Sequence, residues 1–243
     1  MKNRYTQLRV SILFIFLTLL FCWLFCGKYG VFGSKVDWIS QHSVFPDYFR
    51  QQFYDTGDFF PEFALDIGGG QNIYHFAYYG LYSPVFWLSY LLPFVKMSDY
   101  LIAASFVCLT ASIILFYCWL KKRGFSPIIC FLTAGLLLLA APMIFQSYNQ
   151  IMFVNYMPFL CMGLWGVDSF LEKGSSFLYI LSVFFMILTS FYFSVGGILV
   201  LDFIWDAFDT FCYRIYQKKI SAFWRFFRDG IRFFVPHTAC NFC

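Results

Sequence analysis

Long apolar segments bounded by basic residues constrain this chain more than any other feature. A helix needs about 20 mostly apolar residues to cross the hydrocarbon core of a bilayer. The first such segment covers residues 8–26 and follows Lys2, Arg4 and Arg9. It is longer than the apolar part of a signal peptide, and no small-residue cleavage site follows it. We therefore expect a retained membrane anchor at the N-terminus.

The later apolar segments predict further membrane helices. We expect spans over residues 100–120, 125–145 and 152–171, and two short spans within 177–211 that turn near residues 194–197. Charged residues make up only 12% of the chain and hydrophobic ones 60%, whereas a soluble domain carries about 25% charged residues. This composition excludes a soluble enzyme and a nucleic-acid binder. It predicts an all-α integral membrane protein with about six transmembrane helices.

The positions of Lys and Arg predict the orientation. With a cytoplasmic N-terminus, 13 of the 17 basic residues fall in inner segments and 4 in outer ones. Because Lys and Arg concentrate in cytoplasmic loops, we predict a multi-pass plasma-membrane protein in that orientation. Residues 1–219 then form one polytopic membrane domain with a large outer loop over about 27–97. Residues 220–243 read as the approach to a further span that breaks off into a polar stub, so we expect a truncated product.

The outer loop carries most of the acidic residues that precede the second span. Asp37 differs from the others because it lies near the first span and next to Trp38, whose ring favours the headgroup level. Gln41 follows one helical turn later. Such a carboxylate can accept a proton from a hydroxyl or orient a phosphate-linked substrate through a cation, and it can equally cap a short interfacial helix. Loop carboxylates also suit Mg²⁺ or Mn²⁺, although the pattern assigns no metal ligands and firmly implies no cofactor.

Other loop segments have patterns of their own. Phe45, Phe49 and Phe53 recur at helical spacing opposite Arg50, which predicts a helix lying in the membrane interface. The sequence GGGQN at 68–72 predicts a backbone turn, and residues 85–95 are too short to cross, so they predict a second interfacial or re-entrant helix.

Other polar residues of the loop and the spans give less specific signals. The Tyr-rich segment with Tyr78 and Tyr79 is typical of a membrane surface or a sugar-binding cleft. Asn155 lies near the outer end of its span, where a polar side chain usually faces the bundle interior. His42, His75 and His237 are too scattered along the sequence to indicate a ligand set.

The order of these features resembles that of the bacterial YfhO-type membrane proteins, which belong with the GT-C glycosyltransferases. The likeness extends from the first span to about residue 235, and no single motif in it is diagnostic. The motifs that carry it are Asp37-Trp38 with Gln41, Tyr48-Phe49-Arg50, GGGQN at 68–72, Tyr78-Tyr79-Gly80 with Ser83-Pro84, Asn155-Tyr156-Met157-Pro158, and Phe191-Tyr192.

The resemblance implies a GT-C-like membrane glycosyltransferase. Its expected donor is a polyprenyl-phosphate sugar, and its expected acceptor is a cell-envelope polymer such as teichoic acid, with membrane lipids as surroundings and no nucleic acid. It maps the catalytic acidic residue onto Asp37, and Arg50 is our choice for the donor phosphate because its planar fork suits phosphate oxygens. We assign substrate binding to Gln41, Arg50, Tyr78, Tyr79 and Asn155.

Two other classes stay open. A membrane transporter or lipid-linked sugar flippase shares the aromatic spans and basic inner loops, but favours ionisable residues at the bilayer midplane. An inactive truncated fragment is the third reading, since members of the resembled family continue further. The concentration of acidic residues in one outer loop favours chemistry at the outer interface over passage through the bundle.

Overall fold

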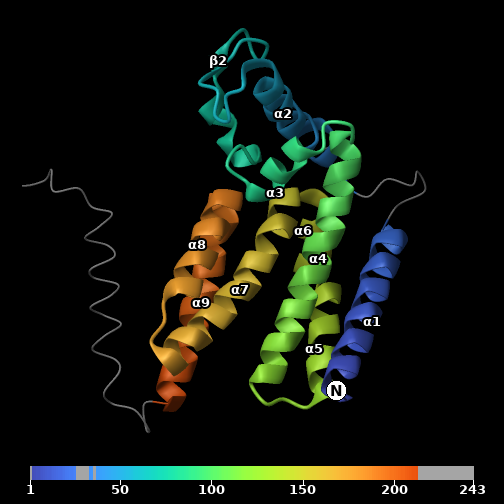
Figure 1. The fold of residues 1–243 in the computed structure, drawn as a ribbon, viewed down its shortest axis with the longest axis vertical. Helices are drawn as coiled ribbons and strands as arrows, with labels where there is room; N and C mark the ends of the chain where they lie inside the picture. The colour runs from blue at the N-terminus through green and yellow to red at the C-terminus, as the bar shows by residue number, and fades with distance from the viewer. Residues whose placement is uncertain (1, 26–32, 35–36, 213–243) are drawn as a thin grey trace, which may run out of the picture. The chain divides into compact units, whose positions relative to one another are not determined.

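The computed structural model describes residues 2–25, 33–34 and 37–212, and these are mostly helical (Figure 1). The chain divides into two compact units, Met1–Leu201 and Asp202–Cys243. The first unit holds every residue of the candidate site described below. The expected approach to a further span at residues 220–243 lies outside the described residues.

Membrane helices are present as expected. Fewer than six of the described helices have the length and composition of a membrane span. Three described helices are long and apolar enough to cross a bilayer: α1 (Lys2–Phe25), α4 (Met97–Lys122) and α7 (Ile151–Lys173). A bent pair, α5 (Pro127–Leu139) and α6 (Ala141–Asn149), supplies a fourth if it is one broken span with a 47° bend. An all-α membrane fold is thus confirmed, whereas the count of six stays a prediction.

The two short spans expected over 177–211 divide at another place. Helix α8 (Phe177–Thr189) ends at Ser190, whose backbone is extended, and α9 (Phe191–Cys212) starts directly after it. The predicted turn near residues 194–197 is therefore wrong. Gly197 lies inside α9, where a Cβ atom would approach the Met186 side chain to 2.3 Å, so the glycine permits close helix packing. Helix α8 has 13 residues, about 20 Å of helix against a hydrocarbon core of about 30 Å.

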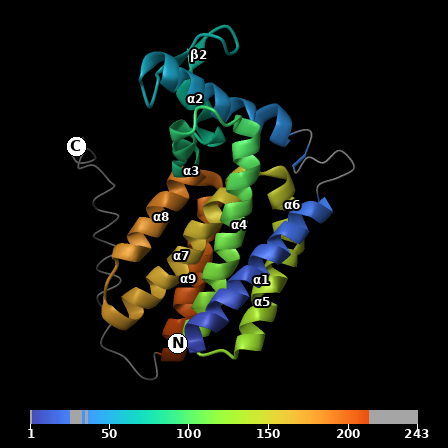
Figure 2. The same cartoon turned by 45° about the vertical axis from the view of Figure 1, so that its right-hand side comes forward.

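Helix α7 lies at the centre of the bundle, between α4 and α8 (Figures 1 and 2). Its buried residues include Ile151, Met152 and Val167. Gly166 allows α8 to approach closely, because a Cβ atom there would lie 2.6 Å from the backbone of Tyr179. Helix α4 also packs against α1 and α5. The N-terminal ends of α4 and α7 lie at the end of the bundle that carries the large loop (Figure 1).

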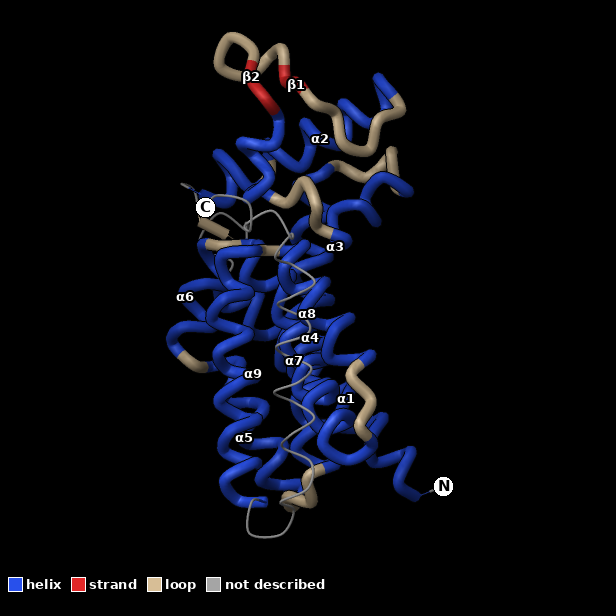
Figure 3. Tube along the Cα trace, turned by 90° about the vertical axis from the view of Figure 1, so that its left-hand side faces the viewer, coloured by secondary structure: helices blue, strands red, loops and turns tan. Residues whose placement is uncertain are grey.

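The large loop forms a small folded region on that end. Its elements are the π-helix η1 (Trp38–His42), α2 (Val44–Thr56), the strands β1 (Phe63–Ala64) and β2 (Gln71–Asn72), the 3₁₀ helix η2 (Ile73–Tyr79), α3 (Pro84–Trp87) and the 3₁₀ helix η3 (Leu88–Leu91). The strands pair antiparallel, Phe63 with Asn72 and Ala64 with Gln71. Figure 3 shows them at the end of the loop region remote from the bundle.

The loop predictions can be compared with these elements. The aromatic helix is present as α2, and Phe49 lies in a buried cluster with Ala64, Ile73 and Leu81. The predicted turn is present too, since the glycines at 68–70 all have positive φ. The second helix, expected over 85–95, is limited to α3 and η3. It ends before Leu92, because that residue precedes Pro93 and a residue before proline avoids the α conformation.

Candidate functional site

Asp37 lies at the start of η1, where Ser34 fixes the backbone. The Ser34 amide donates to the carbonyl of Tyr148 on α6 at 2.9 Å, which ties the loop to the bundle. The Ser34 hydroxyl accepts hydrogen bonds from the amides of Asp37 at 3.3 Å and Trp38 at 3.4 Å. Trp38 is buried beneath Gly33, where a Cβ atom would lie 2.4 Å from the indole ring. The ring therefore anchors η1 inside the protein instead of facing headgroups.

Gln150 connects Asp37 to the rest of the site. It occupies the short connection between α6 and α7, in an extended conformation. Its Nε2 donates to Asp37 Oδ2 at 3.3 Å, and its Oε1 accepts from His42 Nε2 at 3.0 Å and from the Tyr78 hydroxyl at 3.5 Å. One amide thus joins a carboxylate, an imidazole and a phenol. We call Asp37, Gln41, His42, Tyr78, Tyr79 and Gln150 the Asp37 group.

Aromatic rings complete the Asp37 group. The Tyr79 hydroxyl donates to Gln41 Oε1 at 3.0 Å, and the Tyr79 ring lies 5.9 Å from that of His42. Tyr78 contacts the rings of Phe191 and Tyr192 at the start of α9, with centroids 6.0 and 6.4 Å away. The structure therefore brings together four residues that the sequence predicted for the site, and places them at the junction of loop and bundle.

The surroundings of His42 keep it neutral. It is 1% exposed, and this burial lowers its pKa from the ordinary value of 6.5, against the opposing effects of the Gln150 hydrogen bond and the Asp37 charge. Because Gln150 Oε1 can only accept, Nε2 carries the proton and Nδ1 is an acceptor. That Nδ1 is buried without a hydrogen-bond partner. Burial, followed by the neighbouring Tyr79, Tyr192 and Asp37, raises the pKa of Tyr78 above 10 and keeps it a neutral donor.

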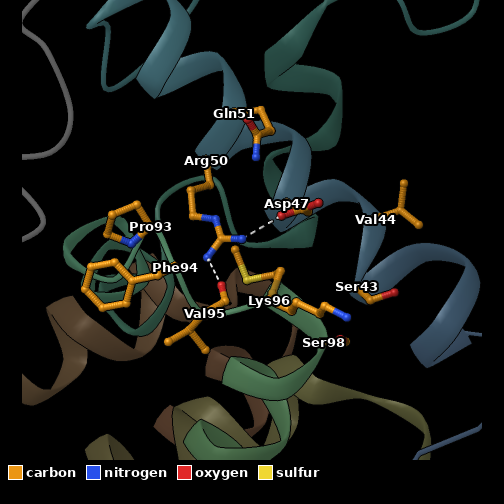
Figure 4. A pocket seen from close by; sticks show the side chains of 11 residues that line it. Ser43, Val44, Asp47, Arg50, Gln51, Pro93, Phe94, Val95, Lys96 and Ser98 are labelled. Carbon is orange, nitrogen blue, oxygen red and sulfur yellow. Dashed lines mark hydrogen bonds and ion pairs between the residues drawn. The ribbon is translucent and has the colours of Figure 1, made fainter.

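Arg50 lies on α2 and makes its contacts elsewhere. Its Nη2 donates to Asp47 Oδ1 and its Nη1 to the Val95 carbonyl, both at 2.9 Å. It lines a cavity of about 510 Å³ between α2 and the segment entering α4 (Figure 4). No interaction among the described residues joins it to Asp37, so the structure does not place these two predicted site residues in one group.

Asn155 is fully buried on α7, five residues after Gln150. Neither its Nδ2 nor its Oδ1 has a hydrogen-bond partner. It makes no described contact with the Asp37 group, and its role in substrate binding stays a prediction. Among the described residues, no three His, Cys, Asp or Glu side chains gather closely enough to hold a metal ion.

Comparison with known proteins gives the family. The chain matches the profile described as Bacterial membrane protein YfhO over residues 5–231, nearly its whole length. It belongs to this family. No curated protein and no solved structure matches it. Membership of the YfhO family, together with the apolar helices, establishes a membrane protein, and the matched region contains the whole Asp37 group.

Sequence reasoning missed two members of the Asp37 group, Gln150 and His42. Gln150 lies in a predicted connection that is distinguished in the sequence only by being short and uncharged. His42 was not assigned to the site because the histidines are too scattered along the sequence to indicate a ligand set. Their partners are far away along the chain, because Gln150 lies 113 residues after Asp37 and 108 after His42. The usable signal was topological, since the predicted spans put residues 27–97 and 146–151 on the same side of the membrane.

Proposed function

We propose that this YfhO family member is a membrane glycosyltransferase. It moves a sugar from a polyprenyl-phosphate donor to a hydroxyl of a cell-envelope acceptor such as teichoic acid. The observation that carries the proposal is the Asp37 carboxylate, oriented by the Gln150 amide at the junction of loop and bundle. The donor and acceptor classes come from the family resemblance.

The chemistry requires a base because an acceptor hydroxyl is a poor nucleophile. As the acceptor oxygen bonds to the anomeric carbon, the bond from that carbon to the phosphate oxygen breaks, and the lipid phosphate leaves with the electron pair. The hydroxyl proton passes to Asp37 as general base. Its Oδ2 accepts from Gln150, while Oδ1 has no hydrogen-bond partner among the described residues and is available for the proton.

The residues around Asp37 suit a sugar. Tyr78 and Tyr79 present aromatic rings beside Gln41, whose amide nitrogen can donate to a sugar hydroxyl. Neutral His42 leaves Asp37 as the one charged member of the Asp37 group. In the proposal Arg50 holds the donor phosphate. In the proposal Asn155 binds substrate through Nδ2 and Oδ1, which are buried without a hydrogen-bond partner.

The predicted orientation places this group on the outer side of the plasma membrane, where the acceptor polymer lies. The expectation rests on the Lys and Arg distribution, which puts the N-terminus in the cytoplasm. The loop region and the Gln150 connection share one end of the bundle, which agrees with a single reaction face.

A transfer assay tests the proposal. Membranes carrying the parent chain are supplied with a panel of radiolabelled polyprenyl-phosphate sugars and with cell-wall polymer, and label in the polymer is measured. Asp37→Asn should lower transfer on the order of 10²- to 10⁴-fold, the usual contribution of a general base. Asp55→Asn, an exposed position on α2, is the matched control and should change little. Transfer by Asp37→Asn within a few-fold of the parent would show that Asp37 is not the base.

A further inference from the structure

Helices α7 and α8 pack in an antiparallel register that can be followed towards the loop region. A Cβ atom on Gly163 of α7 would lie 3.4 Å from the Ser182 hydroxyl of α8. About one turn closer to the loop region, the rings of Phe159 and Phe185 stack with centroids 5.3 Å apart. Each step along α7 therefore faces an equal step along α8.

The next pair in this register is polar. Asn155 lies one turn before Phe159 on α7, and Thr189 lies one turn after Phe185 on α8. Residues four apart share a helix face, so Asn155 and Thr189 occupy facing positions. Asn155 is 0% exposed and Thr189 is 1% exposed. The Asn155 Nδ2 and Oδ1 and the Thr189 Oγ1 are all without a hydrogen-bond partner. Buried polar atoms are nearly always paired, so these three atoms indicate a bound ligand.

Two interruptions of the helices add backbone oxygens at the same level. Pro158 lies inside α7 and has no N–H, so the carbonyl of Val154, four residues earlier, lacks its helical donor. Helix α8 ends at Thr189, because Ser190 has an extended backbone. The last carbonyls of a helix have no intrahelical partner, and this end of the helix carries partial negative charge. The facing ends are therefore rich in hydrogen-bond acceptors.

The loop region covers these acceptors with a further hydroxyl. Ser83 is 0% exposed, and its Oγ has no hydrogen-bond partner. Its amide donates to the Gly80 carbonyl at 2.9 Å, and a Cβ atom on Gly80 would lie 3.3 Å from Met152 on α7. Ser83 also caps α3, which packs against α8 at the loop side of the bundle (Figures 1 and 2). Ser83 therefore lies over the ends of both helices.

The acceptors are neutral oxygens, and this determines the class of ligand. Carboxylates are the usual ligands of Ca²⁺ and Mg²⁺, and no carboxylate belongs to this set. Backbone carbonyls coordinate K⁺ in channels, and the C-terminal ends of interrupted helices coordinate Na⁺ in transporters. The partial negative charge at the end of α8 favours a cation over an anion. Neutral oxygens with one such helix end suit a single positive charge.

We propose that these oxygens bind one alkali cation, Na⁺ or K⁺. The ligands are the Asn155 Oδ1, the Thr189 and Ser83 hydroxyls, the Val154 carbonyl and the last turn of α8. The ion joins α7, α8 and the loop region. Its remaining coordination positions can meet a substrate oxygen, which is compatible with the substrate contact proposed for Asn155. Cation binding goes beyond the proposed function, because it needs no sugar donor and is measured without one.

The first experiment measures cation binding to the purified full chain in detergent by scintillation proximity. The probes are radioactive sodium ions and radioactive rubidium ions, which stand in for K⁺, and N-methylglucamine chloride keeps the ionic strength constant. We expect saturable binding, and the more tightly bound probe identifies the ion. Absence of saturable binding by both probes would overturn the cation site and assign these oxygens to buried water. Displacement by Mg²⁺ at equal concentration would overturn the alkali cation.

The second experiment repeats the measurement with variants. Thr189→Val removes the hydroxyl but keeps the shape of the side chain, and it should weaken binding at least about tenfold. Thr189→Ser keeps the hydroxyl and should bind nearly as the parent does. Ser83→Ala should weaken binding in the same direction and provides a second test at a separate element.

Thr110→Val is the matched control. Its Oγ1 is also buried without a partner, but it lies on α4, so this variant should bind as the parent does. Parent-like binding by both Thr189→Val and Ser83→Ala would overturn the proposal. Equal weakening by Thr110→Val and Thr189→Val would also overturn it, because the effect would then not be specific to the α7–α8 contact.

Asp37→Asn separates this site from the Asp37 group. It should bind the alkali cation as tightly as the parent, because Asp37 is not among the ligands. Loss of cation binding in Asp37→Asn would place the ion at that carboxylate and overturn the site between α7 and α8. Cation binding that depends on Thr189, in a chain that transfers no sugar from any donor, would refute the transferase and leave the cation site standing.

Discussion

Two aspartates at opposite ends of the α4–α7 pair have contrasting partners. Asp168, on the last turns of α7, is 1% exposed and forms ion pairs with Arg123 and Lys122 at the end of α4. Asp37, at the other end, accepts one side-chain hydrogen bond, from the neutral amide of Gln150, and has no cation beside it among the described residues. One carboxylate is neutralised by its neighbours, and the other keeps its charge available.

This contrast separates a structural role from a chemical one. The cations around Asp168 are themselves held in place, since Lys122 also pairs with Glu172 at 3.0 Å and lies 5.5 Å from the Trp165 ring. Each carboxylate oxygen of Asp168 forms an ion pair with one of these cations, so neither oxygen is free to meet a substrate hydroxyl. Asp37 has no such cation among the described residues, and its side chain accepts a hydrogen bond only at Oδ2 there. The same residue type therefore joins two helices at one end of the bundle and serves as the candidate base at the other.

The largest effect on stability should come from Asp168→Asn. Removing one partner of a buried ion pair leaves uncompensated charge, and we expect a loss of about 3 kcal/mol, near the lower end for such pairs because Lys122 and Arg123 keep contact with solvent. Unfolding by denaturing detergent measures the change. Glu172, the exposed partner of Lys122, gives the control. Glu172→Gln should lower the free energy of unfolding by less than about 1 kcal/mol.

Asp168→Asn and Asp37→Asn should also differ in activity. Transfer per folded molecule should be unchanged in Asp168→Asn and lost in Asp37→Asn. The free energy of unfolding should fall in Asp168→Asn and stay near that of the parent in Asp37→Asn. A stable Asp168→Asn variant that fails to transfer sugar would reverse the two roles.

The next effect concerns Gln150, which we regard as a positioning residue. Gln150→Ala removes the hydrogen bond that orients Asp37, and a bond to a charged group contributes about 1.5–3 kcal/mol. Transfer should therefore fall by about ten- to a hundredfold. Gln150→Glu gives a readout that a purely structural role would not affect. A second carboxylate beside Asp37 should raise the pH at which transfer reaches half its maximum. An unshifted pH profile would remove Gln150 from the site.

Sequence patterns predicted the parts of the fold that depend on local physics. The apolar runs predicted α1, α4 and α7 because a helix of that length and hydropathy belongs in a bilayer, and the aromatic spacing predicted α2. The break at Ser190 was misplaced because Gly196 and Gly197 have two uses, in turns and in close helix contacts. The packing of Gly197 against Met186 and Tyr156 decides between them, and the sequence does not show this contact.

The site was predictable only in part, for a related reason. Asp37, Gln41, Tyr78 and Tyr79 share one loop, so local motifs indicated them. Gln150 is defined by what the loop places against it, and a single uncharged residue carries no local signal of such a partner. The membrane topology was the one feature of the sequence that brought both segments to the same side.

The smallest expected effect is a pH dependence of stability that originates at His42. In the unfolded chain this imidazole has the ordinary pKa of about 6.5. In the folded protein burial lowers its pKa, so between the folded and unfolded values the unfolded chain holds more protons. Stability therefore falls as the pH falls below about 6.5, by at most about 1.4 kcal/mol per pH unit, and levels off below the folded pKa.

A detergent unfolding series between pH 7.5 and 5 measures this slope, and subtraction of the His42→Gln series isolates the histidine. His42→Gln removes the titrating group, so its stability should vary less over the same interval. His75→Gln, on the exposed surface of η2, should leave the slope of the parent unchanged. An identical slope in His42→Gln would mean that His42 is readily protonated in the folded protein. Asp37 would then have a cation beside it, as Asp168 does, and the contrast between the two aspartates would fail.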